Sequence, residues 1–203
     1  MLHVVPEAIT QSISSSRIGR LARHAEESHR HLRHVLAEEL PFRTQDRYRA
    51  FLSVQYGFAR EAQPIYEHPL LHVLLPDVSW RSSLDLIVRD IIDLSPRRPF
   101  QPADLVTPGC EDDLPWSLGG LFVAEGISLY GPILSREAMK LGFNSGYGAR
   151  HLSGEPELRL KRWRAFVRAV DGLALSDTEE DRLVTGTHRA LGRLQALASE
   201  VRL

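Results

Sequence analysis

The sequence lacks several features that would identify common classes of protein. It has one cysteine, Cys110, among 203 residues, which excludes an internal disulfide and is typical of a reducing compartment. Its formal net charge is -1, so no basic surface favours nucleic acid as a partner. No apolar run reaches the roughly 18 residues that span a membrane, and the first residues do not read as a secretory leader. These absences predict a soluble cytoplasmic protein without a nucleic-acid or membrane partner.

The apolar residues, 43% of the chain, recur at intervals of three and four. This spacing predicts amphipathic helices over 17–39, 44–66, 83–94, 157–170 and 176–201. Stretches rich in proline, glycine and acidic residues near 95–115 and 142–157 predict loops between them. No run of alternating apolar and polar residues suggests a β-strand. The sequence therefore predicts an all-α protein of about seven to eight helices, with one domain over 17–203 and a loose N-terminal arm over 1–16.

One apolar stretch, 118–134, is unusual because it combines helical character with residues that disfavour a helix. It contains Gly119, Gly120, Gly126, Gly131 and Pro132. Glycine costs roughly 1 kcal/mol in a helix relative to alanine and proline about 3. Such residues are retained where the helix bends or where another group approaches the backbone closely. We expect a bend here, because Pro132 has no N–H to donate to the carbonyl of Ser128. Tight helix–helix packing without a ligand is the alternative.

His29 is the histidine that falls on the apolar face of the first predicted helix. His24, His31 and His34 fall off that face. A histidine in such a position is often a core residue with satisfied hydrogen bonds, but imidazole is also a common axial ligand of haem iron. A haem lying between two helices needs the ligand from one and bare backbone from the other. His29 and the region of Gly126 are complementary in that sense.

With this pairing, the chain resembles the bacterial haem oxygenases. The resemblance rests on SHRHL, YRAFLSVQYGFAREAQPIY, LFVAEG and GARHL in this order, and covers about residues 17–200. It implies a single-domain helical bundle that holds haem, which is both cofactor and substrate, between two helices. It also implies opening of haem to biliverdin, carbon monoxide and ferrous iron, using molecular oxygen and an external electron donor. A reductase or ferredoxin is the expected donor, and a bacterial phytochrome is a candidate partner for the product.

The resemblance also assigns roles to individual residues. His29 matches the axial ligand of the haem iron, and Gly126 matches the first glycine of the distal helix. Bacterial members tend to have a further bare position where this chain has Tyr130, and a polar residue where it has Ile127. If the bend turns Tyr130 outward, Gly131 takes the bare position; if Tyr130 points inward, it fills space needed by oxygen.

Further residues are expected around the haem. Phe122 is expected to pack against the haem edge, although a core phenylalanine would give the same pattern. Arg164 and Arg168, one helical turn apart, are expected to bind the propionates. A solvated basic face is the alternative there, with Arg20 and Arg23 as other propionate partners.

Three other interpretations remain open at this stage. A non-enzymatic haem-binding or sensing relative, altered by Tyr130, is the main alternative to an enzyme. A thiamin-degrading helical enzyme would need a pocket cysteine and carboxylates that the sequence does not place. His68 and His72 have the spacing of a metal-binding pair but no third ligand. In GARHL, Arg150 and His151 are expected to fix a loop through hydrogen bonds.

Overall fold

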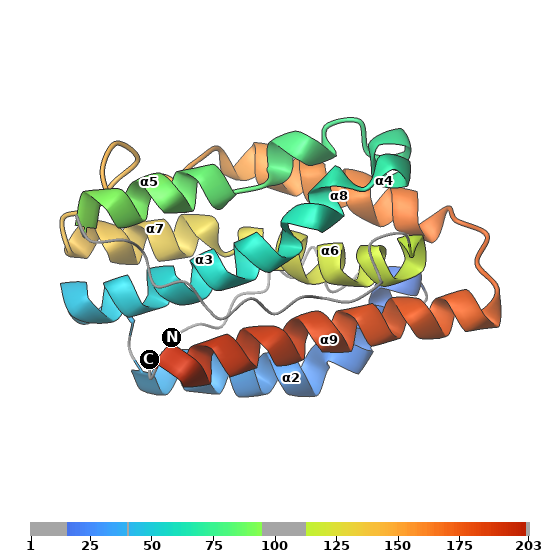
Figure 1. Cartoon of the computed structure of the whole chain (residues 1–203), viewed down its shortest axis with the longest axis horizontal. Helices are drawn as coiled ribbons and strands as arrows, with labels where there is room; N and C mark the ends of the chain where they lie inside the picture. The colour runs from blue at the N-terminus through green and yellow to red at the C-terminus, as the bar shows by residue number, and fades with distance from the viewer. Residues whose placement is uncertain (1–15, 40, 95–112, 202–203) are drawn as a thin grey trace.

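The computed structural model describes residues 16–39, 41–94 and 113–201; at 28–29 and 31–39 it describes the backbone alone. Within these residues the chain forms eight α-helices, one 3-10 helix and two isolated β-bridges at Asn144, but no strand (Figure 1). The elements are α2 (Arg17–Glu39), α3 (Gln45–Glu67), α4 (Pro69–Leu74), η1 (Val78–Arg81), α5 (Leu84–Leu94), α6 (Leu114–Ser128), α7 (Gly131–Lys140), α8 (Pro156–Asp171) and α9 (Asp177–Val201). The all-α prediction is confirmed. The predicted arm lies outside the described residues, apart from Ser16.

Side-chain caps fix the starts of several of the helices. The hydroxyl of Ser16 accepts a hydrogen bond from the N–H of Gly19 at 3.1 Å at the start of α2. Thr44 caps α3 by accepting from the N–H of Arg47 at 3.2 Å. Ahead of α9, the carboxylate of Glu179 accepts from the N–H of Ser176 at 2.8 Å, which is half of a capping box.

The glycine-bearing stretch forms two helices rather than one. α6 starts earlier than expected, at Leu114 with Asp113 as its cap, and ends at Ser128. α7 starts at Gly131, and the two axes are bent by 44°. Pro132 provides no donor for the carbonyl of Ser128, which instead accepts a hydrogen bond from Nη1 of Arg159 at 2.9 Å. The predicted bend is therefore present, and a side chain from α8 satisfies the carbonyl that it leaves free.

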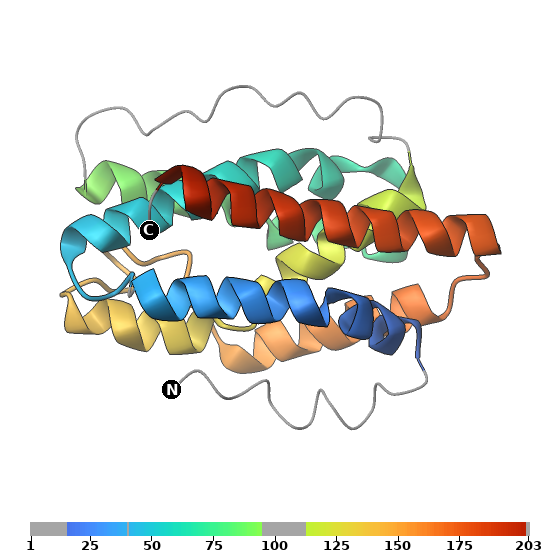
Figure 2. The ribbon, with the colours of Figure 1, turned by 90° about the horizontal axis from the view of Figure 1, so that it is seen from below.

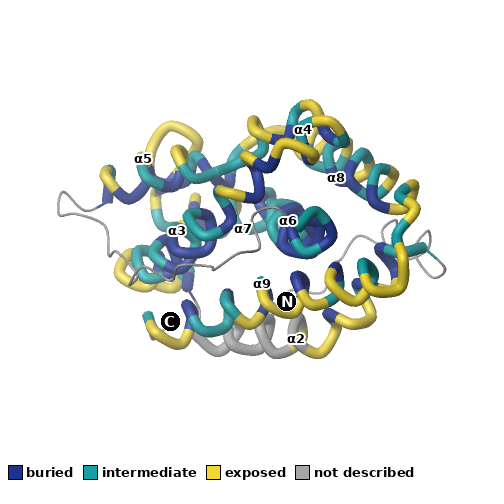
Figure 3. The backbone as a smooth tube through the Cα atoms, turned by 45° about the vertical axis from the view of Figure 1, so that its right-hand side comes forward, coloured by how far each residue is buried: buried dark blue, intermediate teal, exposed yellow. Residues whose placement is uncertain are grey.

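α6 lies at the centre of the bundle and is largely buried (Figure 3). It packs most extensively against α9, and bare backbone makes the approach possible. A Cβ atom on Gly119 would stand 2.6 Å from the backbone nitrogen of Thr187. A Cβ atom on Gly186 would overlap the backbone of Trp116. At these positions the packing explanation of the glycines is correct.

The start of α2 is tied to the far end of α8 and to α9. Arg17 forms an ion pair with Glu180 at 2.7 Å and donates to the backbone carbonyls of Val170 and Leu173. The N–H of Ile18 donates to Asp171 at 3.1 Å. From this anchor α2 runs alongside α9 (Figure 2).

No single helix in the described ranges is long and apolar enough to cross a membrane, although the bent pair α6 and α7 together meets those limits of length and composition.

Candidate functional site

α2 and α6 are the two helices that the sequence assigns to the site. Both pack against α8 and against α9, so the two helices share these neighbours. His29 lies in the backbone of α2 near its middle, and its side chain is outside the described part of the structure. All side chains of α6 lie within the described part of the structure.

Gly126 differs from the other glycines of the same stretch. A Cβ atom built on Gly126 would meet no atom of the described residues within 4 Å. A Cβ atom on Gly120 would lie 2.5 Å from Cδ1 of Ile65, and one on Gly119 would strike α9. Gly126 is thus the glycine of α6 whose missing side chain leaves open space rather than room for a neighbouring element.

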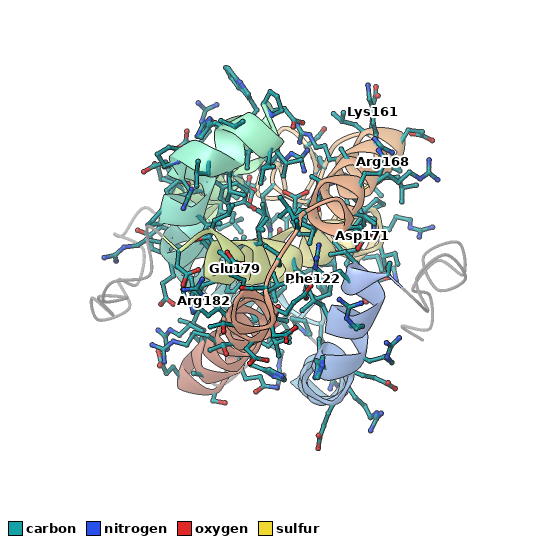
Figure 4. All side chains as sticks on the ribbon, turned by 90° about the vertical axis from the view of Figure 1, so that its right-hand side faces the viewer. Phe122, Lys161, Arg168, Asp171, Glu179 and Arg182 are labelled. Carbon is teal, nitrogen blue, oxygen red and sulfur yellow. The ribbon has the colours of Figure 1, made fainter. Side chains whose placement is uncertain are left out.

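Phe122 and Tyr130 lie four residues before and after Gly126, so the three residues share one face of the helix; we call it the Gly126 face. Phe122 is buried, and its ring centroid lies 5.8 Å from that of Trp163 on α8. Figure 4 shows Phe122 on the inner side of α6. Tyr130 is half-buried and sits in the break between α6 and α7 with helical dihedral angles, φ -79 and ψ -10. The break therefore does not remove Tyr130 from the helical path.

Gly131 has a different environment from Gly126. A Cβ atom on Gly131 would stand 2.8 Å from Cζ of Arg159. The guanidinium that occupies this space donates to the carbonyls of Ser128, His151 and Ser153. The structure thus places Gly131 against α8, on a face of the helix away from Gly126, where it leaves room for Arg159.

The two arginines expected to bind propionates lie on α8. Arg164 and Arg168 are both exposed, and Figure 4 shows Arg168 on the outer side of this helix. Of the alternative partners, Arg20 forms an ion pair with Glu180 at 3.4 Å. The structure leaves both arginines of α8 accessible to a ligand from solvent but does not bring them into contact with Gly126.

A buried ion pair next to Gly126 was not singled out from the sequence. Nη1 of Arg81 donates to Oε2 of Glu125 at 3.2 Å, and the two side chains are only 2% and 5% exposed. Arg81 also donates to Asp77 at 2.8 Å and to the carbonyl of Arg162. Burial raises the pKa of Glu125, and the positive charges of Arg81 and Arg162 limit that rise. This cluster ties the end of α6 to η1 and α8 and so fixes where Gly126 points.

The loop that follows α7 is held by a buried carboxylate on α5, as the sequence led us to expect for Arg150 and His151. Asp90 accepts hydrogen bonds from the backbone N–H groups of Arg150 and His151, each at 3.0 Å. It also accepts from Nδ1 of His151 at 2.8 Å and forms an ion pair with Arg150. Asp90 is the partner that sequence reasoning missed, because it lies on a helix 60 residues earlier in the chain.

Metal binding by histidine and carboxylate clusters finds no support in the described ranges. They contain no group of three or more His, Cys, Asp or Glu residues that could hold a metal ion. His68 instead caps α4, its Nδ1 accepting from the N–H of Leu70 at 3.1 Å, and His72 lies near the hydroxyl of Ser79.

A helical bundle with a broken, glycine-bearing central helix opposite a histidine-bearing helix is the arrangement expected of the haem oxygenase class. Comparisons with known proteins agree, although no protein-family model matches the chain. The chain is 30% identical over 190 residues to heme oxygenase PigA of Pseudomonas aeruginosa, covering 94% of this chain and 93% of that protein. Its fold matches the NO- and CO-bound heme oxygenase from Neisseria meningitidis with a TM-score of 0.84 and 26% identity, over 92% of each chain.

The chain belongs to the haem oxygenase family. This confirms the resemblance noted in the sequence, and with it the helical fold that the resemblance implied.

Proposed function

We propose that the chain is a haem-degrading oxidoreductase that opens haem to biliverdin, carbon monoxide and ferrous iron. Family membership supports the reaction. The observation within the structure that carries the proposal is the space beside Gly126, where no atom of the described residues stands in the way of a flat ligand. A helix that had only to pack would fill this space, as α6 does at Gly119 and Gly120.

In this proposal, α2 and α6 hold the haem from opposite faces. His29 would bind the iron through a neutral imidazole, and the Gly126 backbone would face the ring without a side chain in the way. Phe122 packs against the edge of the ring, while Arg164 and Arg168 bind the propionates from α8. When bound, the haem supplies the iron at which oxygen and electrons from an external donor react. The protein contributes binding, orientation and exclusion of water.

Gly131 acts in this proposal through the helix break. Its missing side chain admits Arg159, whose Nη1 donates to the carbonyl of Ser128 at 2.9 Å. Arg159 thereby fixes the angle at which α6 ends, and with it the approach of the Gly126 face to the haem. Tyr130 lies on that face and limits the space available for oxygen.

Other parts of the sequence-based interpretation stay predictions. These are the reductase or ferredoxin that donates electrons, a phytochrome as recipient of the product, and the cytoplasmic location. The chain belongs to the haem oxygenase family, so the thiamin-degrading alternative no longer applies. The non-enzymatic alternative depends on Tyr130 alone and is tested together with the main proposal.

The test is to add haemin to the purified protein, record the visible spectrum, and then add a reductant under air. Loss of the haem absorbance with release of carbon monoxide is expected. Tyr130→Gly is measured in parallel, since it restores the bare position. A wild type that binds haem but never degrades it, while Tyr130→Gly does, would overturn the enzyme proposal in favour of a binding protein.

A further inference from the structure

Two histidines from different helices meet at the surface of the bundle. His24 lies on α2 and His188 on α9, and their ring centroids are 6.3 Å apart, with the ring planes at 80° to each other. Both residues are exposed, so solutes can reach both rings. His24 lies off the apolar face of α2 on which His29 falls, so the proposed haem site does not use this pair.

The backbones that carry the two rings are held by packing on the inner side of each helix. On α2 the residue after the histidine, Ala25, is fully buried, and on α9 the residue before the histidine, Thr187, is fully buried as well. One turn before the histidine of α2, Arg20 forms an ion pair with Glu180 of α9 at 3.4 Å. The two helices therefore stay side by side at this level (Figure 2), while the exposed rings can still change rotamer.

The separation of the two rings suits a shared metal ion. Imidazole is the commonest metal ligand in proteins and binds Zn²⁺, Cu²⁺ and Ni²⁺. With metal–nitrogen bonds of about 2.0–2.1 Å, two imidazoles on one ion have ring centroids roughly 5 Å apart at neighbouring tetrahedral positions and roughly 6.5 Å apart at opposite positions of a square plane. The 6.3 Å between His24 and His188 lies within this range. A ring contact without a metal ion is the alternative explanation.

We propose that His24 and His188 form a site for a first-row divalent transition-metal ion, Zn²⁺, Cu²⁺ or Ni²⁺, that joins α2 to α9. The pair supplies two ligands and water supplies the others, since no third His, Cys, Asp or Glu side chain completes a cluster of three within the described ranges. The unfolded chain does not hold the two imidazoles together, so the ion binds the folded protein more tightly and stabilises it. The ion thereby fixes the helix to which the proposed function assigns the iron ligand, but the site does not depend on that function.

Zn²⁺ added to the haem-free protein tests the site. In side-chain 15N NMR of the wild type, the imidazole signals of His24 and His188 should shift together over the same range of Zn²⁺ concentration. In calorimetric titration, His24→Gln and His188→Gln should each bind Zn²⁺ at least about tenfold more weakly than the wild type. The double variant should bind no more weakly than either single variant, because the two ligands act as one unit. Zn²⁺ should raise the urea midpoint of the wild type but of neither single variant.

His72→Gln is the matched control, because His72 is a partly exposed histidine of α4 whose ring lies beside the hydroxyl of Ser79. This variant should keep the affinity of the wild type for Zn²⁺ and its stabilisation by the ion. Wild-type affinity in His24→Gln or in His188→Gln, or Zn²⁺ that does not shift both rings, overturns the proposal and leaves a ring contact as the explanation of the pair. If a variant does not fold, the NMR titration of the wild type decides. None of these measurements uses haem, so a failure of the proposed function does not affect their outcome.

Discussion

The guanidinium carbon of Arg159 lies 2.8 Å from the point where a Cβ atom on Gly131 would stand. Glycine at this position therefore determines whether the arginine can reach the carbonyls at the end of α6 and in the following loop. Since the arginine side chain is flexible, an added methyl group would displace it rather than the helix. The hydrogen bond from Arg159 to the carbonyl left free at the helix break thus depends on the absence of a side chain at Gly131.

Gly131→Ala is expected to destabilise the protein by about 1–3 kcal/mol, which is the usual cost of buried hydrogen-bonding groups left without partners. Urea unfolding measures the change. Gly192→Ala is the control, because Gly192 lies exposed in α9 and no described atom stands within 4 Å of its Cβ position. It should gain up to about 1 kcal/mol from helix propensity. If Gly131→Ala gained as much stability as Gly192→Ala, Arg159 would not need the space beside Gly131.

Gly119 and Gly126 should respond to alanine in opposite directions. Gly119→Ala drives a methyl group into the backbone of α9 and is expected to cost at least about 2 kcal/mol, within the range for overpacked cores. Gly126→Ala should stabilise the haem-free protein by up to about 1 kcal/mol. Gly126→Leu should fold but bind haem at least about tenfold more weakly, or 1.4 kcal/mol. Unchanged haem affinity and turnover in Gly126→Leu would remove this residue from the site.

His29→Ala should weaken haem binding and abolish the spectrum of a histidine-ligated haem. His31→Ala and His34→Ala, on the same helix but off its apolar face, serve as controls and should retain it. Absorption spectra of the three variants with added haemin make the comparison, and free imidazole should restore the spectrum of His29→Ala. An unaltered spectrum in His29→Ala would contradict its assignment as the iron ligand.

The free energy of unfolding should decrease as the pH falls below about 6.5, the ordinary pKa of histidine. Burial lowers the pKa of folded His151, with Asp90 opposing and Arg159 reinforcing that effect, so the unfolded chain takes up the proton first. Protonation then favours unfolding until the pH reaches the lowered pKa. His151→Gln should show a shallower decrease than the wild type in urea unfolding between about pH 6.5 and 5. Parallel curves would show that His151 is not held neutral by burial.

Asp90 makes the free energy of unfolding depend on pH in a second, lower range. Its pKa in the folded protein is lower than the ordinary value of 3.8. The stability that it contributes is therefore complete above this value and is lost as the pH falls through the lowered pKa. Asp90→Asn should remove this part of the acid sensitivity.

Local signals in the sequence were sufficient for the longer helices and for the bend, but not for α4 and η1. Thr44 and Ser176 mark helix starts because capping depends on residues three positions away, and Pro132 marks the break because its missing N–H is a property of one residue. The same signals could not distinguish Gly119 from Gly126. Both are glycines in one apolar helix, and the atoms that fill or leave the space beside them come from elsewhere in the chain.

The site was predicted less completely for the same reason. The resemblance to a family singled out Gly126, beside whose Cβ position the described residues leave space, but Gly131 as a second bare position depended on the direction of the bend. That direction is set by Arg159, which lies 31 residues from Ser128 in the sequence. The pairing of Asp90 with His151 and that of Arg81 with Glu125 likewise join separate helices and loops. No spacing within a helix reveals such contacts.

The direct backbone contact between α6 and α9 affects how a ligand can enter the site and how a product can leave it. With no side chain between the two helices at Gly119 and Gly186, there is no rotamer to change and little room for one helix to slide over the other. The α6 wall is therefore stationary. Haem is a rigid flat molecule and its product is a longer open chain. Any part of the protein that moves to admit the one or release the other therefore lies outside the contact between α6 and α9. Beyond the break at Leu129, Gly131 faces the flexible side chain of Arg159 rather than the backbone of a neighbouring helix, so this end of the distal wall is held by a side chain alone.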